Sequence, residues 1–187
     1  MLPYCHSFEH HYQLPSIQAL YPSGKFDVIK RIPMSLLDSA FCQWLFEHTI
    51  EISELVVAWK PAQPLGYNKT PYGTVHSDGP NITKINFVLG GTGSQMIWFA
   101  EPEKTSDSKT AIQTHFRRAD EQQPLTVVYQ EPIRAALVNA EPFHFIENIQ
   151  TDRFAIQCTL RDLSTKKNLA FAQAHTRLFG QHTCNTP

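Results

Sequence analysis

The sequence of 187 residues lacks a strong excess of charge of either sign. Sixteen lysine and arginine side chains stand against 17 aspartate and glutamate side chains, which gives a formal net charge of −1 at pH 7. Such a balance creates no strong field that would attract phosphate backbones or anionic lipid. The charge therefore offers no evidence for a nucleic-acid partner.

Long apolar runs and closely spaced cysteines are also absent. No stretch approaches the roughly 18 apolar residues that a membrane-spanning helix needs, and the N-terminal stretch MLPYCHSFEHHYQLP is polar and rich in histidine. The cysteines form no C-x-x-C pair, so neither a zinc knuckle nor a disulfide framework is indicated; they are Cys5, Cys42, Cys158 and Cys184. We expect a soluble, cytoplasmic protein without a membrane partner, whose oligomeric state the sequence does not indicate.

The length fits a single domain, 1–187, and the residue patterns place its core at about 52–161. A helix is predicted over 34–48, beginning near Pro33 and Ser35; its expected apolar face consists of Leu37, Phe41, Trp44 and Leu45. Seven short apolar runs follow, separated by proline, glycine, asparagine and aspartate: ELVVAWK, ITKINFVLG, QMIWFA, LTVVYQ, RAALVNA, FHFIEN and RFAIQCTL. Without helices between them, such runs predict a mainly β protein, an antiparallel sandwich or barrel with flanking helices.

Two other segments do not follow this pattern of short apolar runs. Residues 103–123 are polar and charged, and we interpret them as a long surface insertion in the β series. Residues 166–179 are predicted to hold a short helix near the C-terminal end.

A candidate metal site begins in the pentapeptide VHSDG. His76 and Asp78 are two positions apart, and in an extended chain residues i and i+2 point to the same side. Their ligand atoms can therefore converge on one ion. A turn aspartate beside a surface histidine is the alternative, because this pattern is common by chance.

A third ligand has to come from another part of the chain, and His144 is the best-placed histidine. It lies in NAEPFHFIEN, late in the β series, where an antiparallel barrel would return it to the first strands. Two imidazoles and one carboxylate form the facial triad of non-haem Fe(II) oxygenases, which leaves coordination positions open for a co-substrate and dioxygen.

The run after His144 adds a separate element. In DRFAIQCTL polar or small residues alternate with apolar ones, so one face, with Arg153 and Gln157, is polar and the other apolar. The apolar face is expected to pack on a helix or second sheet. The polar face points either to solvent or into a barrel mouth, where a guanidinium can bind a carboxylate through two charge-assisted hydrogen bonds.

The order His76-x-Asp78, His144, Arg153 and then FAI resembles the 2-oxoglutarate and Fe(II)-dependent oxygenases, and PFHFIENIQTDRFAIQCTL is most similar to the prolyl-hydroxylase-type branch. The resemblance covers roughly 72–160. It implies a double-stranded β-helix, also called a jelly-roll or cupin-like barrel, with Fe(II) on the two histidines and the aspartate. It further implies that Arg153 binds the distal carboxylate of 2-oxoglutarate, which is decarboxylated to succinate while a substrate is hydroxylated or oxidatively demethylated with dioxygen.

One position departs from the family pattern. Many relatives have a tyrosine on the strand after the His-x-Asp pair, where this chain reads TKINFVLGG; Lys84, Asn86 or Gln157 are the candidates to replace its bond to the co-substrate. The substrate, a peptide or a small molecule, is not identified by the sequence. Two alternatives stay open: a cupin-like metalloprotein that does not use 2-oxoglutarate, and a non-catalytic β-sandwich binding module.

Overall fold

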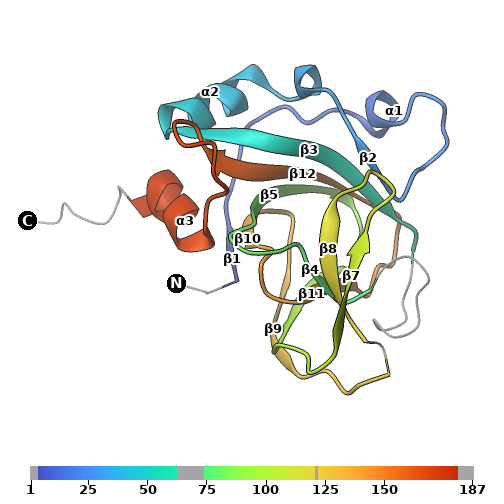
Figure 1. The fold of residues 1–187 in the computed structure, drawn as a ribbon. Coiled ribbons are helices and arrows are strands. Elements are labelled where there is room, and N and C mark those ends of the chain that lie inside the picture. Colours follow the sequence, from blue (N-terminus) through green and yellow to red (C-terminus); the bar gives the residue numbers. More distant parts are fainter. Residues whose placement is uncertain (1–3, 63–73, 121, 181–187) are drawn as a thin grey trace, which may run out of the picture.

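The computed structural model describes residues 4–62, 74–120 and 122–180, which form two six-stranded antiparallel sheets with helices packed on the first of them (Figure 1). The first sheet has the spatial order β1 (Cys5–Ser7), β10 (Ala135–Asn139), β5 (Thr83–Gly90), β12 (Arg153–Asp162), β3 (Ile50–Lys60) and β2 (Ile29–Arg31). The second has the order β7 (Thr105–Lys109), β8 (His115–Ala119), β4 (His76–Ser77), β11 (His144–Glu147), β6 (Gln95–Phe99) and β9 (Val127–Pro132). The helices are α1 (Ile17–Leu20), the 3-10 turn η1 (Met34–Leu36), α2 (Ser39–Glu47) and α3 (Phe171–Phe179).

The main hydrophobic core lies between the first sheet and the helices. Because successive residues of a strand point to opposite faces, Ile156 and Cys158 of β12 face α2, which contributes the fully buried Phe41 and Leu45. The ring of Phe41 meets that of Phe87 on β5 edge-to-face, with the centroids 5.2 Å apart. The opposite face of the first sheet turns to the second sheet, and the candidate site lies between the two.

The sequence-based fold prediction is confirmed at the level of a mainly β, antiparallel architecture. Each of the seven apolar runs contains a strand, namely β3, β5, β6, β9, β10, β11 and β12. The helix predicted near the C-terminal end is present as α3, although it begins only at Phe171.

The helix predicted over 34–48 is shorter than expected. Residues Met34–Leu36 form the turn η1, and α2 begins at Ser39 because the carboxylate of Asp38 accepts a hydrogen bond from the backbone N–H of Ala40. The other carboxylate oxygen of Asp38 accepts from the N–H of Gln13. Asp38, rather than Pro33 or Ser35, therefore caps the helix.

The segment 103–123, interpreted above as a surface insertion in the β series, is ordered in large part, because β7 and β8 form a paired hairpin within it. The hairpin joins the second sheet through β4, with Arg118 opposite His76. Most of its side chains are polar, and only Phe116 and Ala119 of β8 are apolar, so the alternation that marks a half-buried strand is missing from the sequence. Backbone pairing, the buried Ala119 and exposed contacts such as Arg117 with Glu101 hold the hairpin.

Three of the four cysteines lie among the described residues, and each is a free thiol. Cys5 and Cys158 are buried and Cys42 is half-buried, while Cys184 lies outside the described residues. In the part of the chain that the structure describes, no helix combines the length and the apolar character needed to cross a bilayer.

Candidate metal centre

His76, Asp78 and His144 converge on one point between the sheets. His76 opens β4 and His144 opens β11, and the two residues are direct partners in the antiparallel pairing, so their rings lie side by side with centroids 4.6 Å apart. Asp78 follows two residues after His76 and turns to the same side. Its Oδ1 is 3.8 Å from Nε2 of His76, and its Oδ2 is 3.8 Å from Nε2 of His144.

All three side chains offer ligand atoms within 4.8 Å of one another. The predicted triad is therefore brought together by the fold: His76 and His144 are 68 residues apart in the sequence but paired on neighbouring strands of the second sheet, and Asp78 directly follows β4. Two imidazole nitrogens and one carboxylate oxygen suit a divalent first-row metal with open positions, Fe(II) among them.

Backbone carbonyl groups fix the orientation of both imidazoles. Nδ1 of His76 lies 2.7 Å from the carbonyl oxygen of Thr74, and Nδ1 of His144 lies 2.8 Å from that of Pro142. A carbonyl oxygen only accepts, so each Nδ1 carries the proton and each Nε2 presents its lone pair to the centre. Phe116 of β8 packs edge-on against the ring of His76, with centroids 5.6 Å apart.

Burial keeps the two histidines neutral. Desolvation, with a contribution from His76, lowers the pKa of His144 to about 3, and desolvation also lowers the pKa of His76. Burial alone would raise the pKa of Asp78, but the adjacent Lys84 ammonium above all, with smaller contributions from His76 and His144, outweighs burial and holds that pKa below its usual range. Near neutral pH the site therefore presents two neutral imidazoles and one carboxylate, the protonation state that metal binding requires.

Lys84 of β5 is the direct electrostatic partner of the site. Its Nζ lies 2.8 Å from Oδ2 of Asp78, and the two side chains are only 13% and 12% exposed. The same ammonium group donates a long hydrogen bond of 3.5 Å to Oε1 of Gln157. Lys84 was considered above as a co-substrate contact, whereas its closest partner in the structure is the carboxylate ligand itself.

The site lies in a cavity of about 290 Å³ between the two sheets. Polar groups come from the first sheet: Lys60, Lys84, Asn86, Arg153 and Gln157. Apolar side chains form much of the remaining wall: Val28, Ile29, Met96, Phe116, Val138 and Ile146. Asp78 is the single acidic residue among the described residues that line it, so cations predominate in this cavity.

Arg153, Asn86 and Gln157, the three residues predicted to bind a co-substrate, all line this cavity. Gln157 is paired with Asn86 across β12 and β5, which places both amides on the face that the triad occupies. Arg153 is 3% exposed, and desolvation, followed by the charge of Arg134, lowers its pKa to about 10. Of the two alternatives for the polar face of β12, the solvent-facing one is therefore wrong for Arg153.

Four residues that line this cavity have a buried polar atom without a hydrogen-bond partner among the described residues: Oγ1 of Thr74, Oδ2 of Asp78, Oδ1 of Asn86 and Nε of Arg153. Oδ2 of Asp78 still has its ion pair with Lys84. A buried polar group without a partner costs free energy, on the order of 1–3 kcal/mol. Oδ1 of Asn86 and Nε of Arg153 therefore favour a polar ligand in the cavity.

A glycine makes room for the arginine. Gly91 follows β5 with φ +64°, and a Cβ at this position would lie 2.7 Å from Cγ of Arg153 and 2.9 Å from its Cβ. Only glycine fits both the left-handed backbone and the close approach. Gly91 thus lies in the turn between β5 and β6, and it leaves room for the side chain of Arg153.

The hairpin of β7 and β8 closes one side of the cavity mouth. Its tip reaches across to the first sheet, where Oγ1 of Thr114 donates to Oε1 of Glu54 on β3 at 3.0 Å. Lys109, Thr110, Ala111 and Phe116 of this hairpin line the cavity. These contacts were missed by the sequence reasoning, because the hairpin has no apolar periodicity that would indicate where it packs.

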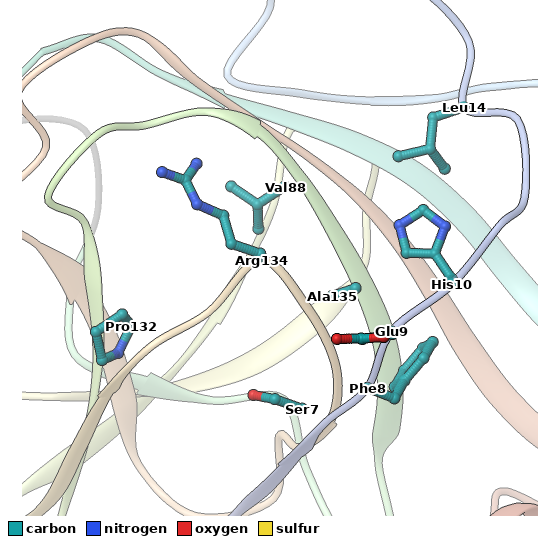
Figure 2. Close-up of a pocket in the computed structure, with 9 residues that line it drawn as sticks. All are labelled: Ser7, Phe8, Glu9, His10, Leu14, Val88, Pro132, Arg134 and Ala135. Atoms are coloured by element: carbon teal, nitrogen blue, oxygen red, sulfur yellow. The ribbon is translucent and has the colours of Figure 1, made fainter.

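A second, more open cavity of about 470 Å³ lies beside the N-terminal segment (Figure 2). His10 and Leu14 approach from this segment, and Val88 and Arg134 lie on the opposite side. Arg134 donates a hydrogen bond from Nη1 to the carbonyl oxygen of Gly90. This cavity shares no lining residue with the metal-centre triad, and the metal-ligand cluster found among the described residues lies elsewhere.

Comparison with known proteins gives no match: the chain matches no model of a protein family, no curated protein and no solved structure. The candidate function therefore depends on the residues and their arrangement.

Proposed function

We propose that this protein is an Fe(II)- and 2-oxoglutarate-dependent oxygenase that hydroxylates or oxidatively demethylates a substrate with an accessible C–H bond. The observation that carries the proposal is the shared cavity of the His76-Asp78-His144 triad and the buried Arg153, whose Nε lacks a partner among the described residues. The triad fits an iron with open coordination positions. The guanidinium fits a carboxylate.

The strand order supports a double-stranded β-helix as the underlying fold. Within the larger sheets, β10-β5-β12-β3 faces β9-β6-β11-β4, and the chain alternates between the two sets in the manner of a jelly roll. In this arrangement the triad comes from β11 and the segment of β4, and the arginine comes from β12 on the facing sheet. The added strands β1 and β2 extend the two edges of the first sheet, and β7 and β8 extend the second sheet beyond β4.

The residues of the site have separable tasks in the proposed reaction. Bound iron with 2-oxoglutarate and dioxygen supplies the oxidising power. Nε2 of each histidine and the carboxylate of Asp78 would hold the metal, and Lys84 keeps that carboxylate ionised. Arg153 would orient the distal carboxylate, and the apolar wall of the cavity excludes water from the reacting atoms.

Asn86 and Gln157 replace the tyrosine that many members of the family carry. Both amides can donate and accept hydrogen bonds, and the unpartnered Oδ1 of Asn86 points to a donor on a ligand or on an ordered water. Their position beside Arg153 on the face of the first sheet is compatible with contacts along the co-substrate chain.

The test is an anaerobic titration of the purified protein with Fe(II) and then with 2-oxoglutarate, followed through the visible charge-transfer absorption of a chelated 2-oxo acid. We expect a band that saturates at one equivalent. Arg153→Leu is expected to retain iron and to weaken 2-oxoglutarate by about 2–5 kcal/mol, whereas the exposed Arg31→Leu serves as the matched control.

The other outcomes separate the alternatives. Iron binding without the band would favour a cupin-like metalloprotein that does not use 2-oxoglutarate. No stoichiometric metal would leave a non-catalytic binding module.

A further inference from the structure

We propose that Trp98 and Tyr129 form an electron-transfer path from the metal centre to the protein surface, and that Glu131 accepts the proton that Tyr129 loses when it is oxidised. The path supplies electrons when an oxidant forms at the metal and no substrate is bound. The inference rests on the proposed function and goes beyond it, because oxidation of a substrate does not itself require these residues.

A row of directly opposite residues crosses the second sheet. His76 of β4 is paired with His144 of β11. On its other side His144 is paired with Trp98 of β6, and Trp98 is paired with Tyr129 of β9. Directly opposite residues project to the same face, with Cβ atoms about 4.5–5.5 Å apart. The row therefore leads from the two imidazoles of the candidate metal centre to the edge strand of the sheet.

The rings of Trp98 and Tyr129 connect a buried position with an accessible one. Trp98 is fully buried, whereas Tyr129 is half-buried. Their ring centroids are 5.7 Å apart. Tyr4 stacks on Tyr129 with centroids 5.6 Å apart and an interplanar angle of 14°, and it contacts Trp98 at the same centroid distance. An electron can thus pass between adjoining rings from the surface to the residue beside His144.

The chemistry of these rings differs from that on the opposite face of the same strands. Indole and phenol are among the side chains that are oxidised most readily, whereas a phenyl ring is resistant. On the face turned away from the cavity, β6 and β11 contribute Phe99 and Phe145 to an apolar cluster. The readily oxidised rings of this row therefore lie on the face that His144 shares.

Tyr129 has a proton acceptor in place. Its hydroxyl donates a hydrogen bond to Oε2 of Glu131, and the thiol of the buried Cys5 donates to the same oxygen at 3.0 Å. Burial, followed by the bond to Glu131, raises the pKa of Tyr129, so the phenol keeps its proton until it is oxidised. The phenolic proton then moves to the carboxylate as the electron leaves.

Trp98 has a different partner and a different task. Its Nε1 donates to the backbone carbonyl oxygen of Asn139 at 3.0 Å. A carbonyl oxygen is a weak base, so the indole retains its proton when it gives up an electron. Trp98 therefore transmits electrons, and Tyr129 is the residue at which electron and proton leave together.

The electron balance shows what the path contributes. Reduction of dioxygen takes four electrons: 2-oxoglutarate gives two as it becomes succinate and carbon dioxide, and the substrate C–H bond normally gives the other two. Without substrate, Tyr129 gives one electron through Trp98 and its proton goes to Glu131. A small thiol in solution then gives a hydrogen atom to the tyrosyl radical, and Glu131 releases its proton to water. After two such cycles the two thiyl radicals combine as a disulfide, and the remaining oxygen atom, with two protons, leaves as water.

A methionine at the cavity wall indicates what the path protects. Met96 lies two residues before Trp98, lines the cavity of the metal centre and is 4% exposed. Oxidation of its thioether to the sulfoxide would place a polar group in an apolar wall. Electrons that arrive through Trp98 consume the oxidant before it reaches this side chain.

The experiment uses hydrogen peroxide on the Fe(II)-loaded protein, because peroxide oxidises the bound metal without 2-oxoglutarate. Peroxide takes one electron from Fe(II) and one from Tyr129 and, with two protons, becomes two water molecules. Electron paramagnetic resonance of rapidly frozen samples is expected to show a tyrosyl radical in the unmodified protein. Tyr129→Phe, which keeps the ring and removes the hydroxyl, is expected to lose this signal, and Glu131→Gln to weaken it.

Tyr4→Phe is the matched control, because Tyr4 contacts the same two rings but its hydroxyl has no hydrogen-bond partner among the described residues. This variant is expected to retain the radical. Trp98→Phe is expected to weaken the radical signal and to increase Met96 sulfoxide, which mass spectrometry measures. The melting temperature of each metal-free variant reports its effect on the fold.

Several results would overturn the path. These are no radical in the unmodified protein, an equal signal in Tyr129→Phe, or an equal loss in Tyr4→Phe. A lower melting temperature of Trp98→Phe with an unaltered radical signal would assign the tryptophan to packing alone. A Tyr129 radical formed with peroxide, but no charge-transfer band with 2-oxoglutarate, would refute the proposed function and support the path. The band without the radical would do the reverse.

Discussion

Replacing Lys84 by methionine tests how the metal-free site is held together. Lys84 and Asp78 form an ion pair of 2.8 Å in the cavity, and both side chains are almost fully buried. In Lys84→Met the carboxylate stays in place without this cation. The variant is therefore expected to unfold more readily when no metal is bound.

The magnitude follows from the burial of the pair. Removing one partner of a buried ion pair costs about 3–5 kcal/mol. Because the pair retains 12–13% exposure, we expect a loss near the lower limit, about 3 kcal/mol. Asn at position 78 removes the carboxylate as well, so the double variant Asp78→Asn/Lys84→Met should recover much of this loss.

Metal affinity should change in the opposite direction. A divalent ion at the triad replaces the cation that the carboxylate has lost, and it no longer meets the repulsion of the ammonium group. We expect Lys84→Met to bind Mn²⁺, an oxygen-stable probe, at least about tenfold more tightly, which equals 1.4 kcal/mol of coupling.

The assays are urea unfolding of the metal-free proteins and calorimetric titration with Mn²⁺. Lys109→Met is the matched control, because Lys109 lines the same cavity at its exposed rim and forms no ion pair among the described residues. If Lys84→Met matched the unmodified protein in both assays, or if its metal affinity fell, the electrostatic account of the site would be wrong.

Two further predictions concern pH and backbone geometry. Burial lowers the pKa of His144 to about 3, so below about pH 6.5 the unfolded chain binds a proton that the folded chain does not. The free energy of unfolding of the metal-free protein should therefore fall by about 2 kcal/mol from this residue between pH 7 and pH 5. Chemical unfolding at both pH values should show a smaller decrease in His144→Gln than in the unmodified protein, and an equal decrease in the two proteins would contradict the assigned burial. Gly91→Ala should cost more stability than Gly24→Ala, since both have positive φ but a Cβ meets Arg153 only at position 91; the left-handed conformation alone accounts for about 1–2 kcal/mol. Gly91→Ala should also weaken 2-oxoglutarate, and equal behaviour of the two variants in melting and titration would exclude the predicted collision.

The strands of the core were predictable because their apolar content is high. Runs such as ITKINFVLG and RFAIQCTL bury one or both faces, so hydrophobic residues dominate them whatever the register. The strands β1, β2 and β4 have three residues or fewer, and the hairpin β7–β8 is polar. These elements depend on pairing with neighbours, which leaves no periodic signal in the sequence.

The residues of the candidate metal site could be predicted from the sequence, but the strand pairing that brings them together could not. His76 and Asp78 share a side because of the two-residue period of an extended chain. Their proximity to His144 depends on the register of β11 with β4, which a sequence does not specify. For the same reason the position of Lys60 directly opposite Arg153, across β3 and β12, could not be predicted.

The direct pairing of His144 with His76 has a consequence for assembly of the fold. Strand residues alternate between faces, so a slip of β11 by one residue would turn His144 away from the cavity and bring Phe145 in. A divalent ion can bind only the correct alignment at full strength. Metal binding would therefore stabilise the chain in which β4 and β11 pair in the correct register, relative to chains in which β11 is shifted by one residue.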